Sequence, residues 1–167
     1  MNHRRIRGCL LAVLLTAPWH VMGAPMPAGA ADGGLFFSQD PALNANKQVV
    51  FHILRDLLEA NHWELADRYI AQEYRQHNPN AADGRAAVVA YFTEVLKVRP
   101  SDIPDRLHTP VIAVLAEGDL VTVLYPRRVR DGGSEYHTTW FDTWRIRDGK
   151  AVEHWDPALL HESPELQ

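Results

Sequence analysis

The residues best suited to chemistry lie near the C-terminus, in the stretch Thr139–Asp156. Its pattern predicts two β-strands joined by a turn, with Asp142, His154 and Asp156 placed among aromatic residues. Aspartate is uncommon in strands because its side chain competes for backbone hydrogen bonds and is costly to bury. Two aspartates and a histidine in one aromatic hairpin therefore predict a ligand pocket.

The turn of this hairpin decides which side chains share a face. If residues 148–149 form a two-residue loop, Asp142 lies opposite Trp155, while His154 and Asp156 point to the other face. If the loop has three residues and begins one position earlier, the pairing shifts by one residue, which moves every side chain of one strand to the other face. One surface then collects Trp140, Asp142, Trp144, Val152, His154 and Asp156. Both loops are common, and the pattern alone leaves the choice open.

Removal of a proton next to a carbonyl group needs a base, and a hydrogen-bond donor for the oxygen that becomes negative. Asp156 is the candidate base, because a carboxylate held in an apolar pocket binds a proton more strongly than one in water. His154 or a protonated Asp142 would donate to the carbonyl oxygen. Five further residues are candidates for contact with the substrate: Tyr74, His77, Asn78, Trp140 and Trp144.

Each of these residues also has a purely structural interpretation. Asp156 can cap a turn before Pro157, and Asp142 can accept hydrogen bonds from the backbone or from tryptophan. His154 can be a core histidine with both ring nitrogens satisfied, and residues 77–79 can form a turn held by its own side chains. The sequence leaves these alternatives open.

Metal-ligating residue types are present, but their spacing matches no recognised pattern. The candidates are His77, His137, His154, Asp142 and Asp156, and none of them forms a helical His-x-x-x-His pair. The sequence also lacks a Gly-x-Ser-x-Gly elbow, a phosphate-binding glycine loop and a dinucleotide fingerprint. We therefore expect no metal and no cofactor.

The first 30 of the 167 residues are expected to lie outside the folded domain. A segment with three arginines, residues 4–7, precedes the apolar stretch Gly8–Pro18, and small residues follow at two candidate cleavage sites, 21–23 and 28–30. This pattern is typical of a cleaved signal peptide, and the apolar stretch is too short to span a bilayer. We therefore expect a periplasmic or secreted protein without a stable membrane anchor.

Removal of the signal peptide would change the chemistry of the chain. Cys9 is the single cysteine and would leave with it, so the mature protein would have no disulfide and no thiol chemistry. Loss of the three N-terminal arginines leaves 14 basic and 21 acidic residues, a net charge of −7. Such a surface argues against nucleic acid or an anionic membrane as a partner.

The chain divides into a signal peptide and leader over 1–30, a flexible segment over 31–43, one domain over 44–160 and a short tail over 161–167. Apolar residues at spacings of three and four predict three helices: Asn44 to about Ala60, Trp63–Tyr74 and about Arg85–Val98. Beyond His108 the period changes to two and predicts four strands: Val111–Ala116, Leu120–Arg130, Glu135–Arg147 and Ala151–Asp156. Helices followed by an antiparallel meander indicate an α+β fold with the helices on one face of the sheet.

Two motifs are shared with a known family. They are Tyr-x-x-His-Asn-Pro at residues 74–79, and Phe-Asp-x-Trp-Arg-Ile-x-Asp-Gly-Lys-x-Val-Glu-His-Trp-Asp at residues 141–156. Together with the order of elements, they resemble the SnoaL-like family of the nuclear transport factor 2-like superfamily, over about residues 47–160. The resemblance implies a cone in which about three helices pack on a curved antiparallel sheet of four or more strands.

The resemblance also carries expectations about the site. In SnoaL-type polyketide cyclases the pocket is aromatic and metal-free, and an aspartate acts as acid and base in an aldol ring closure. Asp156 best matches that aspartate, and Asp142 matches a polar pocket position one strand earlier. In the related ketosteroid isomerases, an aspartic acid at a similar point donates to the substrate oxygen. The resemblance therefore favours the three-residue turn, which puts Asp142, His154 and Asp156 on the pocket face.

These observations favour an exported, cofactor-free enzyme of aldol-cyclase or isomerase type that acts on a small apolar carbonyl compound. One alternative is a non-catalytic protein that holds a small apolar ligand in the same cone. Another is an assembly module, because cones of this type often form homodimers through the outer sheet face. Phe141 and Trp155 would be exposed on that face.

Overall fold

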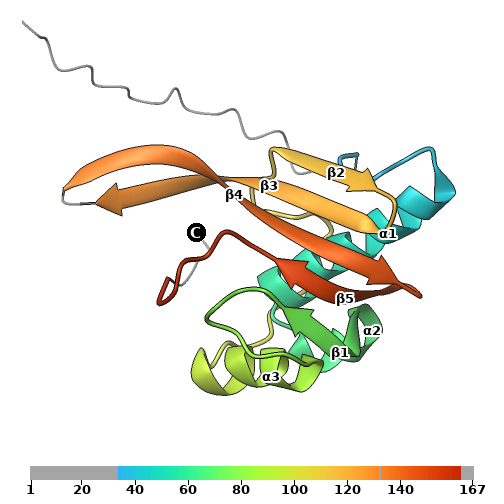
Figure 1. The fold of residues 1–167 in the computed structure, drawn as a ribbon, viewed down its shortest axis with the longest axis horizontal. Coiled ribbons are helices and arrows are strands. Elements are labelled where there is room, and N and C mark those ends of the chain that lie inside the picture. The colour runs from blue at the N-terminus through green and yellow to red at the C-terminus, as the bar shows by residue number, and fades with distance from the viewer. Residues whose placement is uncertain (1–33, 132, 163–167) are drawn as a thin grey trace, which may run out of the picture.

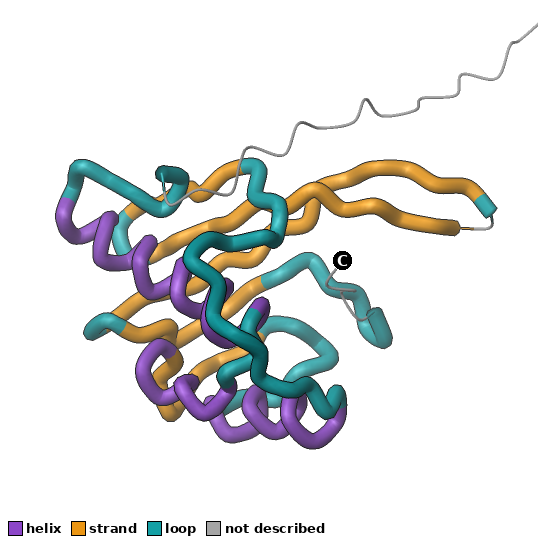
Figure 2. Tube along the Cα trace, turned by 180° about the vertical axis from the view of Figure 1, so that it is seen from behind, coloured by secondary structure: helices purple, strands orange, loops and turns teal. Residues whose placement is uncertain are grey.

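The computed structural model describes residues 34–131 and 133–162. Its five strands form one open sheet in the order β1-β5-β4-β3-β2, which Figure 1 shows from β2 at the top to β1 at the bottom. The helices and the long connection over residues 96–112 cover one face of this sheet (Figure 2). The predicted α+β cone, with helices on one face of a curved sheet, is therefore confirmed.

The expected signal peptide and leader over 1–30, and most of the expected tail over 161–167, lie outside the described residues. Within the described part of the chain, no helix combines the length and the apolar character needed to cross a bilayer.

The first helix begins earlier than the sequence pattern suggested. α1 (Pro41–His52) is capped by Asp40, whose Oδ1 accepts hydrogen bonds from the backbone N–H groups of Ala42 and Leu43 at 2.8 and 3.0 Å. Proline suits the first helical position, because the backbone N–H that it lacks would have no partner there. The helix therefore includes the end of the segment expected to be flexible. It continues as the π-helical turn η1 (Ile53–Glu59).

The second predicted helix is wrong in its C-terminal half. The 3₁₀ turn η2 (Trp63–Leu65) leads into the short helix α2 (Ala66–Tyr69), and the chain then becomes strand β1 (Ile70–Gln76). Ile70 and Tyr74 are both buried at a spacing of four, which mimics a helix, and the pairing of β1 is irregular between Ile70 and Arg75. β1 pairs in parallel with β5, so the sheet is mixed and not wholly antiparallel as expected.

The remaining elements follow the prediction closely. The third helix consists of α3 (Arg85–Ala90) and the π-helical turn η3 (Tyr91–Val95). Four antiparallel strands come next: β2 (Ala113–Glu117), β3 (Leu120–Asp131), β4 (Ser134–Arg147) and β5 (Lys150–Trp155). The β3–β4 hairpin is the longest pair and extends beyond the other strands in Figure 1.

The core lies between the first helix and the sheet. Val50 and Leu57 on the helix and Val121 and Val123 on β3 are completely buried in one apolar cluster with Trp144. Burial of each such side chain contributes about 1.5–3 kcal/mol. This packing fixes β3 and β4, and it therefore fixes the polar side chains that β4 carries toward the helices.

Candidate functional site

The turn between β4 and β5 has two residues. Arg147 pairs with Lys150, and Asp148 and Gly149 both adopt positive φ angles, +49° and +73°. Positive φ at both central positions is the conformation that matches the twist of a two-residue hairpin. The three-residue turn favoured by the family resemblance is therefore wrong.

A β-bulge then corrects the register. The pairing passes from Ile146 with Ala151 to Arg145 with Glu153, so β5 contains one extra residue, Val152. An extra residue moves all later side chains of the strand to the opposite face. The fully buried residue beside Ile146 is accordingly Ala151, and Val152 does not take the position expected for it.

The bulge restores the face that the three-residue turn would have produced. Trp144 lies opposite His154. Asp142, two residues before Trp144, and Asp156, two residues after His154, follow on the same side. All four side chains line a cavity. The expectation that the two aspartates and the histidine share one face is thus confirmed, although by a different local structure.

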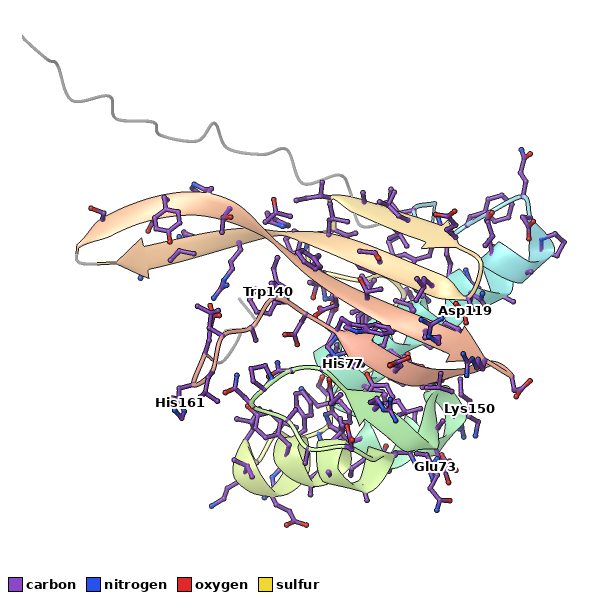
Figure 3. The ribbon with its side chains drawn as sticks, viewed as in Figure 1. Glu73, His77, Asp119, Trp140, Lys150 and His161 are labelled. Atoms are coloured by element: carbon purple, nitrogen blue, oxygen red, sulfur yellow. The ribbon has the colours of Figure 1, made fainter. Side chains whose placement is uncertain are left out.

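The cavity has a volume of about 790 Å³, within the range of small-molecule sites. Strands β1, β3, β4 and β5 form one wall, and η1, α3, η3 and residues 109–110 form the other. Seven of the eight predicted site residues line it: Tyr74, Asn78, Trp140, Asp142, Trp144, His154 and Asp156. Figure 3 labels Trp140 on β4, on the side of the sheet that faces the helices.

His77 is the exception. Its ring stacks on Trp155 at 4.8 Å, and its Nε2 lies 2.8 Å from Oε1 of Glu153. These two neighbours alternate with His154 along β5, so they belong to the opposite face of the sheet. The backbone N–H of His77 donates to the carbonyl of His154 at 3.0 Å, which places it against β5 (Figure 3). His77 therefore anchors the loop after β1 and is not among the residues that line the cavity.

His154 is the centre of the polar cluster. Its Nε2 lies 3.2 Å from Oδ1 of Asp142, and its Nδ1 lies 2.8 Å from Oε1 of Gln76 and 3.9 Å from Oδ2 of Asp156. At least one ring N–H therefore donates, either from Nε2 to Asp142 or from Nδ1 to the side-chain amide of Gln76. The ring lies between the carboxylate of Asp142 and this amide, with the carboxylate of Asp156 slightly farther away.

Donors from the protein hold both carboxylates in place. Asn78 Nδ2 donates to Oδ2 of Asp156 at 2.7 Å, and the backbone N–H of Ala158 donates to Oδ1 at 2.9 Å. Trp140 Nε1 donates to Oδ1 of Asp142 at 3.2 Å. A carboxylate has about four acceptor sites, so these bonds orient the groups and leave capacity for a ligand. Asp156 thus both caps a turn and lines the cavity.

Sequence reasoning missed two polar residues of the cavity wall, Gln76 and Tyr125, and interpreted a third, Trp63, as a core residue. Gln76 orients His154, while Trp63 Nε1 and the Tyr125 hydroxyl are the buried side-chain polar atoms without a partner among the described residues. Burial, and next the charge of Asp142, raise the pKa of Tyr125 well above its ordinary value. The hydroxyl therefore stays protonated and is available as a donor. The period-two pattern of Val121, Val123 and Tyr125 was the available signal for its inward position.

The same cluster is the nearest approach to a metal site among the described residues. Asp142, His154 and Asp156 each offer one ligand atom, and the three atoms lie within 4.8 Å of one another. Both nitrogens of His154 are already engaged, by Gln76 and Asp142. Coordination would require one of these contacts to break. The absence of a metal stays a prediction.

A sequence model of the SnoaL-like domain matches residues 52–154. The chain belongs to the SnoaL-like family. Its fold is similar to that of a proposed polyketide cyclase from Acidithiobacillus ferrooxidans, with 15% identity, a TM-score of 0.51 and coverage of 72% of this chain and 89% of the other. A proposed SnoaL-like polyketide cyclase from Jannaschia sp. CCS1 is 18% identical, with a TM-score of 0.51 and coverage of 72% and 91%.

An NTF2-like protein of unknown function from Burkholderia pseudomallei is 22% identical, with a TM-score of 0.46 and coverage of 67% of this chain and 88% of the other. Curated protein sequences give no match. At these identities the similarity to the first two structures shows the fold alone, and the chemistry must be argued from the site.

Proposed function

We propose that this SnoaL-like protein is a cofactor-independent acid/base enzyme of aldol-cyclase or isomerase type, acting on a small carbonyl compound. The observation that carries the proposal is the convergence of Asp142, His154 and Asp156 on one aromatic-walled cavity. The family and the description of two structural neighbours as proposed polyketide cyclases support the same reaction class.

In the proposed reaction Asp156 is the base. Its carboxylate takes the proton from the carbon next to the carbonyl group. The electron pair of that C–H bond forms a carbon–carbon double bond, and the π pair of the carbonyl group moves to its oxygen. Asn78 and the Ala158 N–H orient the carboxylate for this transfer. In an isomerisation, Asp156 returns the proton to a different carbon of the conjugated enolate. In a ring closure, the enolate carbon attacks a second carbonyl group of the same molecule. In ring closure Asp156 returns its proton to the new alkoxide.

The developing oxyanion needs donors already in place, because donors that are fixed before the reaction cost no reorganisation. His154 or a protonated Asp142 is the donor expected from the sequence, and Tyr125 adds a buried hydroxyl that makes no well-formed hydrogen bond among the described residues. The buried aromatic rings of Trp140 and Trp144 line the cavity together with these groups.

The test compares Asp156→Asn with the wild type on a panel of aryl ketones and β-dicarbonyl compounds, with products detected by mass spectrometry. We expect turnover to be lost while the binding of a neutral fluorescent ligand persists, because asparagine keeps the shape and cannot accept the proton. Asp148→Asn is the matched control, since it removes the same charge from the exposed β4–β5 turn. Equal turnover by Asp156→Asn and the wild type would contradict the assignment.

A non-catalytic ligand-binding protein is the second candidate. It is favoured by the structural use of Asp156, which accepts hydrogen bonds from both Asn78 and Ala158. In that case Asp156→Asn would change affinity only modestly, and no compound of the panel would be converted.

Export and homodimerisation are also part of the proposal. Export rests on the sequence of residues 1–30. Mass spectrometry of the protein recovered from outside the cytoplasm tests it, because cleavage of the signal peptide would lower the mass.

Homodimerisation rests on the outer sheet face, where Phe141 is 43% exposed. Trp155, expected to be exposed there, is half-buried and stacked against His77. Light scattering of the wild type and of Phe141→Ser tests the dimer.

A further inference from the structure

A salt bridge spans the mouth of the cavity. Arg127 on β3 and Glu162 at the end of the described chain both line the cavity, with Nη2 of Arg127 2.5 Å from Oε1 of Glu162. Neither residue belongs to the acid/base cluster. Their side chains are about a quarter exposed, each at 27%, so the pair lies at the boundary between cavity and solvent.

Arg127 is held next to the acid/base cluster by one aromatic ring. Its guanidinium lies 4.5 Å from the ring centroid of Trp140, a distance typical of cation–π stacking. The indole N–H of the same Trp140 donates to Asp142. An anionic group bound by Arg127 would therefore place the rest of a ligand along Trp140, toward Asp142 and Asp156. A stacked guanidinium also keeps its edge free to bind a carboxylate through two parallel hydrogen bonds.

Glu162 reaches Arg127 from a C-terminal turn that burial hardly anchors. Leu159 and Leu160 in this turn are 72% and 63% exposed. The turn is tied to the loop after β1 through Asn80, whose Nδ2 donates to the carbonyls of Leu159 and Glu162 and whose Oδ1 accepts from the N–H of His161. Figure 3 labels His161 in this turn. A few hydrogen bonds, and little apolar burial, hold the carboxylate of Glu162 in position.

The positive charges of the cavity wall lie together at this end. Among the described residues that line the cavity, the ones with a permanent positive charge are Arg127 and Arg128, which are neighbours on β3. The N–H of Leu159, and next Arg127, lower the pKa of Glu162, so its carboxylate is charged at neutral pH. The chain itself thus places a carboxylate on Arg127, which shows what kind of group the position accepts.

We propose that Arg127 is the binding position for an anionic group of the ligand and that Glu162 occupies it until the ligand displaces it. The substrate class becomes an acidic carbonyl compound, with a carboxylate on Arg127 and its carbonyl end at the Asp142 and Asp156 cluster. The carbonyl part of this statement rests on the proposed function, while the anion position stands on its own geometry.

Two fluorescent probes of nearly identical shape test the anion position. Anilinonaphthalenesulfonate carries a sulfonate, and N-phenylnaphthylamine is the same skeleton without it. We expect Arg127→Gln to weaken binding of the sulfonate probe about tenfold, since a hydrogen bond to a charged group is worth that much. Glu162→Gln should strengthen it several-fold, because the competing carboxylate is gone. Binding of the neutral probe should stay unchanged in both variants, which also shows that the cavity is intact.

The exposed pair Arg130 and Glu135, with Nε 3.0 Å from Oε2, supplies matched controls. Arg130→Gln and Glu135→Gln change the net charge by the same amounts outside the cavity and should leave both probes unaffected. The proposal is overturned if Arg127→Gln weakens both probes alike or neither, or if Glu162→Gln weakens the sulfonate probe. Binding of neither probe to the wild type would also overturn it, because the cavity would then not accept the ligand type.

This experiment is independent of catalysis. If the probes behave as expected and no carbonyl compound is ever converted, the anion position stands and the enzymatic function falls. If Asp156→Asn abolishes turnover while the two probes respond identically to Arg127→Gln, the enzymatic function stands and the anion position falls.

Discussion

Two regions of the molecule bring a histidine against aspartate, and they are built differently. In the first, Asp56 is 2% exposed and accepts from Arg55 Nε at 2.7 Å and from the Tyr69 hydroxyl at 2.7 Å, with His52 Nδ1 at 3.1 Å. One carboxylate thus accepts from two donors, one of them a permanent cation, and also contacts His52, whose Nδ1 lies 3.3 Å from Nη2 of Arg55. Every charge in this cluster has a partner within the protein.

The second region is the cavity wall, where carboxylates outnumber the histidine that they contact. Two carboxylates, Asp142 and Asp156, share His154, and both face a cavity of about 790 Å³. The nearby Tyr125 hydroxyl is buried beside Asp142 and makes no well-formed hydrogen bond within residues 34–131 and 133–162. An unpaired buried polar group costs about 1–3 kcal/mol. The comparison teaches that the saturated cluster serves stability, and that the cluster with spare acceptors and an unpaired donor is suited to a ligand.

The largest effect expected from this comparison is on stability. Asp56→Asn should lower the free energy of unfolding by about 3 kcal/mol, because it removes the charge of a buried carboxylate and leaves the half-buried Arg55 without its counter-charge. Asp142→Asn should lower it by only about 1 kcal/mol, the value of one hydrogen bond. Urea denaturation of both variants measures the difference. Equal losses would remove the distinction between the two clusters.

Acid should erase the contribution of Asp56. Burial acts to raise the pKa of Asp56, but hydrogen bonds from Arg55 and Tyr69 outweigh it and hold that pKa below its ordinary value. Such a group stabilises the fold above the unfolded pKa of about 3.9, and the contribution is lost as pH falls through the lower folded pKa. The gap in unfolding free energy between the wild type and Asp56→Asn should therefore be constant near neutrality and close in acid. A gap that widens in acid would contradict this account.

Tyr125→Phe should separate stability from function at the cavity. Because the hydroxyl makes no well-formed hydrogen bond in the part of the chain that the structure describes, its removal should leave the protein as stable as before or more stable, by up to about 1 kcal/mol. If it donates to the reacting oxygen, kcat should fall by about tenfold or more. Tyr136→Phe, at an exposed position on β4, is the control. A loss of stability without a change in kcat would mean that the hydroxyl has a structural partner.

The smallest effect should come from His77, three residues from Tyr74 in the sequence and on the other face of the sheet. His77→Ala removes contacts to Trp155 and Glu153. Because these contacts lie on the face of the sheet opposite the cavity, the affinity for N-phenylnaphthylamine should stay within about twofold, a change well below the 1.4 kcal/mol of a tenfold effect. Asn78→Ala, next to it in the chain, removes the donor to Asp156 and should change both affinity and turnover. Identical behaviour of the two variants would show that the face assignment is wrong.

Much of the fold follows from local pattern. Apolar spacing is enough to place α1, α3 and the strands from β2 to β5. It fails at Trp63–Tyr74, because the strand character of Ile70–Gln76 comes from parallel pairing with β5, which is far away in the sequence. Local propensity has no information about such a partner.

The residue types of the site could be predicted from the sequence, but the local structure that brings them together could not. The types of Asp142, His154 and Asp156 identify the polar face, but their convergence depends on the extra residue at Val152. A bulge of this kind arises from the requirements of both neighbouring strands and leaves no clear local signature. The contact between Arg127 and Glu162 joins residues 35 positions apart through a turn that carries no recognised motif.

The central claim is that Asp156 moves a proton to and from carbon inside the cavity, and deuterium exchange tests it most directly. A carbonyl compound that displaces N-phenylnaphthylamine is incubated with the protein in deuterated water, and nuclear magnetic resonance follows the hydrogens next to its carbonyl group. We expect the wild type and Asp148→Asn to accelerate exchange, and Asp156→Asn not to. Exchange by Asp156→Asn at the wild-type rate, or no exchange of any bound carbonyl compound by the wild type, would contradict the claim.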